Sequence, residues 1–423
     1  MLYRILFILF LIICYKFIPV FEPIGINYLL SLLILGSICY ETYKTWVKLS
    51  VSEENKKRIQ KIGYITLIIC VTITIILSIH KDYPEGNIRY LRTLFILITI
   101  ILGGKIIKEI SNTSLPNFIK NTVLIIFSTL SFLALIEVCF MFISLSHGSG
   151  EAYSGKIWGK KYWNPINKFG FRDEEPKEGN NTVFFIGDSF TAGWGVKNIR
   201  DRFGETTANE LSKKGKKINE INLGRYGADT RLEFHLFEKF IHKTRIKPNQ
   251  VVLQYFVNDV DKFIPKNKKC IPINENIPRL KKMVIEGSYL ANYINSLYPK
   301  NNTSSKLIKE CEYTEQLKHV YSTDSLWQKE ELQLNKFKNY CVKNKITLTI
   351  VFFPFMEDLT LAKKINIENR ITTYCKKNNI KLLDITKYIQ NIPREKRQVS
   401  KTDSHASTII HGIVGKNLVK LIK

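Results

Sequence analysis

Hydrophobic residues are concentrated in the first third of the 423-residue chain. Long runs of Ile, Leu and Phe recur there, and each is suited to crossing part or all of a hydrocarbon core of roughly 30 Å. They extend from Ile5 to Phe17, Ile24 to Tyr40, Ile62 to Ile79, Leu91 to Gly104 and Thr122 to Ser146. The pattern predicts an α-helical transmembrane region at residues 1–146, with about five spans and the lipid bilayer as its partner. The first stretch is short and follows Arg4, so its removal as a signal peptide stays open.

Positive charges between these stretches predict the direction of insertion, because Lys and Arg near a span resist translocation. With the N-terminus inside, the cytoplasmic segments carry ten such residues and the outer loops carry four. An odd number of spans, or the four that remain after signal cleavage, both place the chain after Ser146 outside the cytoplasm. Glu137 lies in the last stretch without an evident basic partner in the others, so a functional role and a helix-packing role are both open.

Beyond residue 147 the pattern changes to short apolar runs separated by amphipathic segments. The runs are Val183–Ile186, Ile218–Leu223, Val251–Phe256, Leu348–Phe353 and Ile380–Leu383, and the segments include Arg202–Lys213, Arg231–His242 and Ser325–Lys343. This pattern is typical of buried parallel strands that alternate with helices. We therefore expect residues 147–423 to form a three-layer α/β/α sandwich with a mostly parallel sheet. An insertion at about 262–325 is a candidate for substrate selection, although a solvated surface excursion is an equal alternative.

Composition narrows the range of partners and cofactors. The net charge of +26 comes from lysines scattered among Asn and Ile, without an Arg-rich helix, zinc-finger spacing or an RNP-like strand, so no nucleic-acid partner is expected. No C-x-x-C pair occurs among the eight cysteines, and neither a metal nor a cofactor is predicted. In an oxidising exterior Cys270, Cys311, Cys341 and Cys375 have three pairings open to them, and buried free thiols are an equal alternative.

Polar residues follow the apolar runs where ligand sites lie in parallel sheets, beyond the carboxyl ends of the strands. Gly187-Asp188-Ser189 follows the first run, Asn222 to Thr230 the second and Phe256 to Asp259 the third, and Asp403-Ser404-His405 lies near the C-terminus. Each group alone is most often a cap or a turn. Their joint order is the signal.

A serine hydroxyl needs a base to take its proton, and the base needs a partner that fixes its tautomer. Of the seven histidines, only His405 combines an expected loop position with a carboxylate, Asp403, two residues before it. Ser189, His405 and Asp403 are thus the candidate catalytic residues. Asp188 and Asp259 are expected to fix turns.

This set resembles the SGNH or GDSL hydrolase family, whose blocks carry Ser, Gly, Asn and His in this order. The resemblance covers roughly Asn164 to the C-terminus and includes a lead-in, Asn167 to Asp173, similar to that of membrane-anchored bacterial members. It implies that Ser189 is the nucleophile and Asn258 the block III asparagine. The block II glycine falls on Gly227, with Gly224 as the alternative. Phe256 stands where block III usually has Gly, and one residue, rather than two, separates Asp403 from His405.

The resemblance also implies an oxyanion hole made by the backbone N–H groups of Ser189 and Gly227 and the side-chain amide of Asn258. We expect the protein to be a membrane-tethered serine esterase. It should cross the membrane several times and have its catalytic domain outside the cytoplasm. Its substrate is expected to be an acylated cell-envelope glycan or glycolipid, with acetyl as the acyl group. The alternatives are an O-acyltransferase that modifies an envelope polysaccharide and a non-catalytic glycan-binding protein. The acceptor and the oligomeric state are open.

Overall fold

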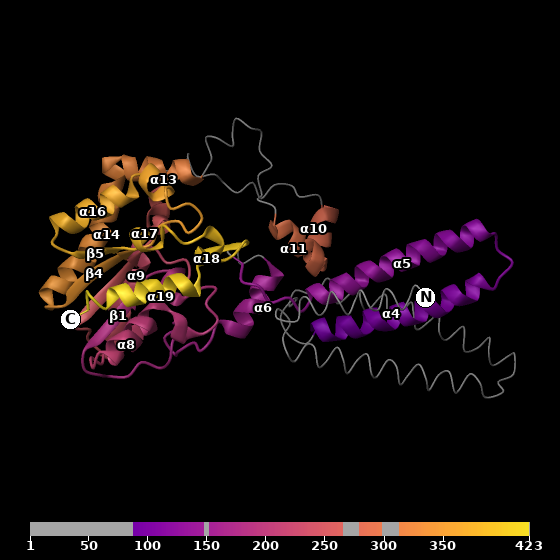
Figure 1. Ribbon diagram of the computed structural model, residues 1–423, viewed down its shortest axis with the longest axis horizontal. Coiled ribbons are helices and arrows are strands. Elements are labelled where there is room, and N and C mark those ends of the chain that lie inside the picture. The colour runs from indigo at the N-terminus through magenta and orange to yellow at the C-terminus, as the bar shows by residue number, and fades with distance from the viewer. Residues whose placement is uncertain (1–87, 148–151, 265–278, 298–312, 423) are drawn as a thin grey trace. The chain divides into compact units, whose positions relative to one another are not determined.

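The computed structural model describes residues 88–147, 152–264, 279–297 and 313–422 (Figure 1). The chain forms two compact units. Unit 1 comprises residues 1–145, 149–158 and 276–298, and unit 2 comprises residues 146–148, 159–275 and 299–423. This division differs from the predicted one, because 149–158 and part of the predicted insertion belong to the unit that contains the apolar N-terminal region. The first three predicted spans lie outside the described residues.

Unit 2 is built on a parallel sheet of five strands. These are β1 (Thr182–Ile186), β2 (Asn219–Asn222), β3 (Gln250–Tyr255), β4 (Thr347–Phe352) and β5 (Lys381–Asp384). The order is β2-β1-β3-β4-β5, and every neighbouring pair is parallel. Each predicted apolar run coincides with one strand to within a residue or two, so the prediction of a mostly parallel sheet is confirmed.

Helices cover both faces of this sheet because successive side chains of a strand point to opposite sides. On β1, Phe184 and Ile186 pack into one core, whereas Val183 and Phe185 pack into the other. The first core is closed by α9 (Thr230–Thr244), α13 (Tyr313–Ser322), α14 (Asp324–Lys343) and α16 (Ile367–Lys377). The second is closed by α8 (Phe203–Lys213), α17 (Thr386–Ile389) and α19 (Thr408–Leu418) (Figure 1). The three-layer α/β/α prediction is confirmed.

Among the described residues, eight short elements lie between the longer helices and strands along the chain. They are α6 (Tyr153–Tyr162), α7 (Ser189–Ala192), η2 (Ile199–Asp201), η3 (Val257–Phe263), α15 (Leu361–Lys364), α18 (Arg394–Arg397), β6 (Gln398–Ser400) and β7 (Asp403–Ala406). β6 and β7 form an antiparallel hairpin. The expected loop position of His405 is therefore wrong, because this residue lies on strand β7.

The described cysteines of unit 2, Cys341 and Cys375, are buried free thiols. Burial raises the pKa of each thiol to about 12, which keeps both protonated and unreactive at neutral pH. For these two residues the structure therefore has the buried free thiols of the second alternative. Cys270 and Cys311 lie outside the described residues.

Four described helices lie entirely within unit 1: α4 (Ile88–Ser111), α5 (Asn117–Phe140), α10 (Arg279–Gly287) and α11 (Tyr289–Leu297). Residues 153–158 of α6 belong to unit 1 as well. In the described part of the chain, α5 alone is both long and apolar enough to cross a membrane. It coincides with the predicted span Thr122–Ser146, but the helix ends at Phe140, and Ser146 lies in extended chain beyond it. The predicted stretch Leu91–Gly104 lies within α4.

Glu137, near the end of α5, binds the first turn of α11. Its carboxylate accepts hydrogen bonds from the backbone N–H groups of Tyr289, at 2.7 Å, and Leu290, at 3.0 Å. It also accepts one from the Ser288 hydroxyl at 2.7 Å. The first N–H groups of a helix have no partner within the helix, and a negative charge there also complements the helix dipole.

Arg92 of α4 completes this cluster, with Nη2 3.1 Å from Glu137 Oε1. The absence of a basic partner for Glu137 was wrongly inferred from the sequence, because the two residues come close only after α4 and α5 pack as a hairpin. Of the two roles left open for Glu137, the contacts support helix packing. Glu137 joins part of the insertion to the helices of unit 1.

We expect Glu137→Ala to free the first turn of α11. Hydrogen bonds to a charged group are each worth about 1.5–3 kcal/mol, so amide exchange at Tyr289 and Leu290 should accelerate by about tenfold or more. Hydrogen–deuterium exchange on the full chain in detergent would measure this. Glu109→Ala, which removes an exposed carboxylate from α4, should leave the exchange unchanged. Equal protection of α11 in both variants would contradict the assigned contacts.

Candidate active site

Ser189 begins α7, directly beyond the carboxyl end of β1. Asp188 caps this helix, since its Oδ1 accepts the Phe190 N–H at 2.8 Å. Gln254 of β3 binds the same turn, because its Oε1 accepts the Asp188 N–H at 3.0 Å and the Thr191 hydroxyl at 3.1 Å. The turn-fixing role predicted for Asp188 is confirmed. Gln254 was not predicted, although a lone amide in the apolar run Val251–Phe256 was a visible signal.

The structure brings Ser189, His405 and Asp403 together in one chain of contacts. His405 Nε2 lies 2.8 Å from Ser189 Oγ, and His405 Nδ1 lies 2.6 Å from Asp403 Oδ1. The same carboxylate oxygen accepts the His405 backbone N–H at 3.1 Å. Residues two apart on a strand point to the same side, so the short Asp403-x-His405 spacing follows directly from their position on β7.

Asp403 is almost completely buried and has a second partner, the hydroxyl of Ser146, which donates to Oδ2. Burial alone would raise the pKa of Asp403. The hydrogen bond and charge of His405 and the Ser146 hydroxyl outweigh this effect and hold the pKa of Asp403 below its usual value. The carboxylate is thus ionised at neutral pH, as an orienting partner of an imidazole must be. Ser146 was not predicted as part of the site, because it was placed at the end of a membrane span.

The two candidate block II glycines have different surroundings. Gly224 packs against the nucleophile turn so closely that a Cβ atom would lie 2.2 Å from the Ala192 nitrogen, and its N–H already donates to Asn222 Oδ1 at 2.9 Å. Gly227 is exposed and has φ = +70°, a conformation that favours glycine. These contacts favour Gly227 over Gly224 as the backbone donor.

Asn258 follows β3 just as Ser189 follows β1, and the parallel pairing of the two strands brings both residues to one edge of the sheet. Its side chain lies beside Asp188. Asp259 accepts the Phe256 N–H at 2.9 Å, which confirms its turn-fixing role. Phe256 has extended backbone, φ = −131°, so glycine is not needed at this block III position. Its ring packs 4.6 Å from that of Phe190.

His411, on α19, is a core residue. It is completely buried, its Nδ1 accepts the Phe203 N–H at 3.2 Å, and its ring stacks on that of Phe203. Burial, with the charges of Arg202 and Arg172, lowers the pKa of His411 to about 3. His411 is therefore neutral, and its Nδ1 is already used as an acceptor by the Phe203 N–H. It does not compete with His405 as a base.

Three carboxylates, Asp173, Glu205 and Glu220, lie within 4.8 Å of one another and have the spacing of a metal site. Arg202 already supplies a cation to this cluster. Its Nη2 lies 2.9 Å from Asp173 Oδ1 and also binds Glu205 Oε1. Because this guanidinium pairs with two of the three acids, its positive charge explains why the carboxylates lie so close together.

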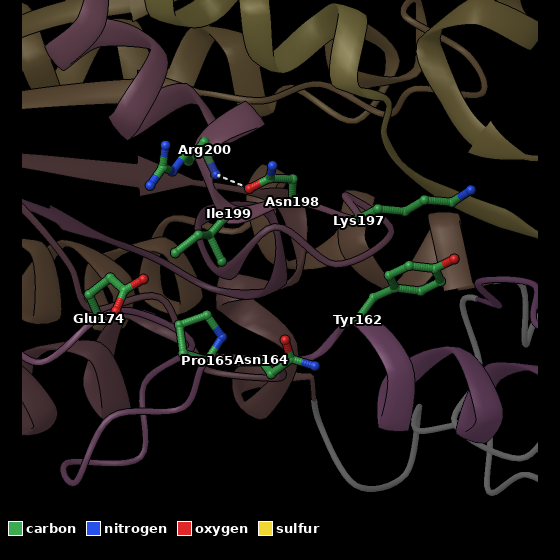
Figure 2. A pocket seen from close by; sticks show the side chains of 8 residues that line it. All are labelled: Tyr162, Asn164, Pro165, Glu174, Lys197, Asn198, Ile199 and Arg200. Carbon is green, nitrogen blue, oxygen red and sulfur yellow. Dashed lines mark hydrogen bonds between the residues drawn. The ribbon is translucent and has the colours of Figure 1, made fainter. Parts of the chain in front are cut away.

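A cavity of about 420 Å³ opens on unit 2 beside the loop that follows α7 (Figure 2). It is lined by Tyr162, Asn164, Pro165, Glu174, Lys197, Asn198, Ile199 and Arg200. Asn198 caps η2 there, with Oδ1 accepting the Arg200 N–H at 3.0 Å. Ser189, His405 and Asp403 do not line it, so this cavity is separate from the candidate catalytic groups.

Comparison with known proteins found no matching family model and no matching curated sequence. Solved structures with a similar fold include a protein assigned to the G-D-S-L lipolytic family from Desulfitobacterium hafniense DCB-2, at 15% identity over 57% of this chain and 99% of that chain, with a TM-score of 0.35. An acetylxylan esterase from Geobacillus stearothermophilus matches at 12% over 58% and 95%, with a TM-score of 0.34. A member of the lipolytic G-D-S-L family from Veillonella parvula DSM 2008 matches at 11% over 57% and 97%, with a TM-score of 0.31.

The chain resembles the SGNH hydrolases. The resemblance rests on its own residues, namely the parallel sheet, the serine at the end of β1 and the contacts of that serine with His405. Similarity at these identities and TM-scores does not bear on reaction or substrate.

Glu330 of α14 is a buried acid, and its Oε1 accepts the Thr230 hydroxyl at 2.6 Å. Burial raises the pKa of Glu330 from 4.5 to about 8, with the hydroxyl and Lys262 opposing the shift. The folded state holds this proton where the unfolded state has lost it. Stability from Glu330 is therefore complete below pH 4.5 and is lost as the pH rises through about 8.

Glu330→Gln should remove this dependence, because the amide stays neutral and its oxygen can still accept the Thr230 hydroxyl. We expect the Tm of the wild type to fall by several degrees more than that of the variant between pH 5 and pH 9. Thermal unfolding across that range would measure it. Glu331→Gln, at the half-buried next position, should follow the wild type. Parallel curves for wild type and Glu330→Gln would show that Glu330 is ionised in the folded state.

Proposed function

We propose that this protein is a membrane-tethered serine esterase that removes an acyl group, with acetyl as the expected group, from a cell-envelope glycan or glycolipid. One observation carries the proposal. Asp403, His405 and Ser189 form a continuous chain of contacts of 2.6 and 2.8 Å at the carboxyl edge of the parallel sheet. A buried ionised carboxylate, an imidazole and a hydroxyl in this order are the arrangement that activates a serine for attack.

The proposed reaction gives each group a role. Ser189 Oγ attacks the ester carbonyl carbon while His405 Nε2 takes its proton, and Asp403 holds the Nδ1–H and stabilises the imidazolium. Backbone N–H groups of Ser189 and Gly227, with the Asn258 amide, stabilise the oxyanion that forms. His405 then returns the proton to the leaving alcohol oxygen. Water attacks the acyl-serine by the same route and releases the carboxylic acid and free Ser189.

The surroundings of Ser189 favour a short acyl group. Only 6% of Ser189 is exposed, and the next residue, Phe190, packs its ring against those of Phe256 and Phe353 at 4.6 and 5.2 Å. These rings already fill the space on their side of the nucleophile. An acetyl group requires far less room there than a long chain does.

Location supports an envelope substrate. α5 is long and apolar enough to cross a membrane. The ten-to-four division of Lys and Arg between alternate loops favours a multi-pass protein with its catalytic domain outside the cytoplasm. O-acylated polymers and glycolipids are the esters that a tethered enzyme meets there. A sugar hydroxyl in place of water in the second step would make the same site an O-acyltransferase, so an added acceptor belongs in the assay.

The triad prediction concerns activity on a soluble acetyl ester and labelling by a fluorophosphonate probe. Ser189→Ala and His405→Ala should each lose about 10⁴-fold or more in kcat/KM. Asp403→Asn should retain more activity, because the residue orients the base without exchanging a proton. Ser404→Ala, an exposed serine between them on β7, should behave as wild type. Labelling that survives in Ser189→Ala would refute the serine mechanism.

The topology prediction concerns the C-terminus. A reporter that is active only after export, fused after Lys423, should be active in cells, whereas one that is active only in the cytoplasm should not. Reporter activity and the amount of fusion protein would be measured for both. The reverse pattern would place the catalytic domain in the cytoplasm and exclude an envelope substrate, while leaving the serine chemistry untouched.

A further inference from the structure

Three aromatic side chains lie in a row beside His405: Trp163, Trp194 and Tyr226, here called the aromatic row. The ring centres of Trp163 and Trp194 are 5.1 Å apart, and those of Trp194 and Tyr226 are 4.9 Å apart. Trp194 lies 6.3 Å from the imidazole of His405. Tyr226 is 44% exposed and both tryptophans are half-buried. Partly exposed rings therefore lie next to the candidate base.

The row is fixed to the catalytic groups by hydrogen bonds. The Trp194 backbone N–H donates to the Ser189 carbonyl at 2.8 Å, and its indole N–H donates to the His147 carbonyl at 3.2 Å. Tyr226 directly precedes Gly227, the candidate oxyanion donor. Burial, followed by the charge of Asp403, raises the pKa of Tyr226, which keeps its hydroxyl protonated. A molecule that touches these rings is thus held close to the nucleophile.

Arg172, from the lead-in Asn167 to Asp173, makes the row rigid. Its buried guanidinium donates to the carbonyls of Gly193, at 2.5 Å, and Val196, at 2.7 Å, on either side of Trp194. It also donates to the Tyr162 carbonyl at 2.8 Å and lies 5.0 Å from the centre of the Trp163 ring. One guanidinium fork thereby ties together the two loops that carry the tryptophans. The lead-in therefore has a structural role, which is to hold the loops that carry the two tryptophans.

We propose that the aromatic row is a subsite for a pyranose ring of an O-acylated glycan, next to the sugar oxygen that leaves as an alcohol. The proposal rests on the serine esterase function and adds its substrate class. Flat, half-exposed Trp and Tyr rings with polar edges match the C–H face and the hydroxyl rim of a sugar. A fatty chain instead requires an enclosed apolar channel. Because Arg172 orders the loops beforehand, stacking costs little conformational entropy.

The experiment compares two kinds of ester, with and without a sugar, on the full chain in detergent. Acetate release is measured from partially O-acetylated chitotriose and xylotriose, and from vinyl acetate, a small ester without a sugar. The readout is the ratio of kcat/KM on the trisaccharides to kcat/KM on vinyl acetate. Trp194→Ala and Tyr226→Ala should each lower this ratio by about tenfold or more, and Trp194→Phe should restore part of it.

Tyr340→Ala is the matched control. This half-buried tyrosine lies near the end of α14 and packs against Phe234 and Phe237. The chain enters β4 shortly after it, so Tyr340 is close to the amino ends of the strands, and the candidate site is at their carboxyl ends. The ratio should not change in this variant. A ratio that is unchanged in Trp194→Ala and Tyr226→Ala would overturn the subsite, and so would a wild type that cleaves vinyl acetate but neither trisaccharide.

A binding measurement separates the two proposals. Ser189→Ala, which cannot turn over, is titrated with unacetylated chitotriose and xylotriose by calorimetry, alone and combined with Tyr226→Ala. The subsite predicts binding that weakens by about tenfold in the double variant. Failure of the wild type to cleave any ester would refute the esterase function while these titrations still decide whether the row binds sugar. No binding of either trisaccharide would overturn the subsite alone.

Discussion

The parallel pairing of β1 with β3 is the constraint on which the candidate site depends. It brings the residues that follow each strand to one edge of the sheet, so Ser189 and Asn258 become neighbours although nearly seventy positions of sequence lie between them. Gln254 then connects the two strands' ends through the Asp188 N–H and the Thr191 hydroxyl. The backbone turn that exposes Ser189 is held by polar groups of a neighbouring strand, which is why a strand interior contains an amide. His405 reaches this edge from a separate hairpin.

Much of this could be predicted from the sequence, because the signals involved are local. Apolar runs marked all five strands, and the order Ser, Gly, Asn, Asp-x-His marked the residues that the fold assembles. The hairpin of Asp403 and His405 was read as a loop, since strands as short as β6 and β7 have no recognisable apolar pattern. The contacts that support the site were missed for another reason. Ser146, Gln254 and Arg172 act through partners distant in the chain, and nothing in their neighbourhood identifies those partners.

Buried arginines tie the segments around the site together. Arg172 and Arg202 are almost completely buried, and each binds carbonyl or carboxylate oxygens of several segments. In a low-dielectric interior a lone guanidinium is costly, but five donors in a fixed plane can hold several loops at once. The lead-in before β1 thus contributes cohesion around the site, whereas Ser189 and its partners contribute the chemistry. Glu137 has the same function in unit 1, where one carboxylate joins α5, α4 and α11.

The distribution of the two units along the chain has a practical consequence. The chain passes between the units five times, at residues 145–146, 148–149, 158–159, 275–276 and 298–299. A truncation that starts at residue 147, where the hydrophobic pattern ends, would remove the Ser146 hydroxyl that binds the carboxylate behind His405. It would also leave α11 without α5, exposing the ring of Tyr293, which packs 5.1 Å from Phe140. A fragment made this way would lack a hydrogen bond to Asp403 and would expose apolar surface on α11, so low activity or aggregation of the fragment would say little about the full chain.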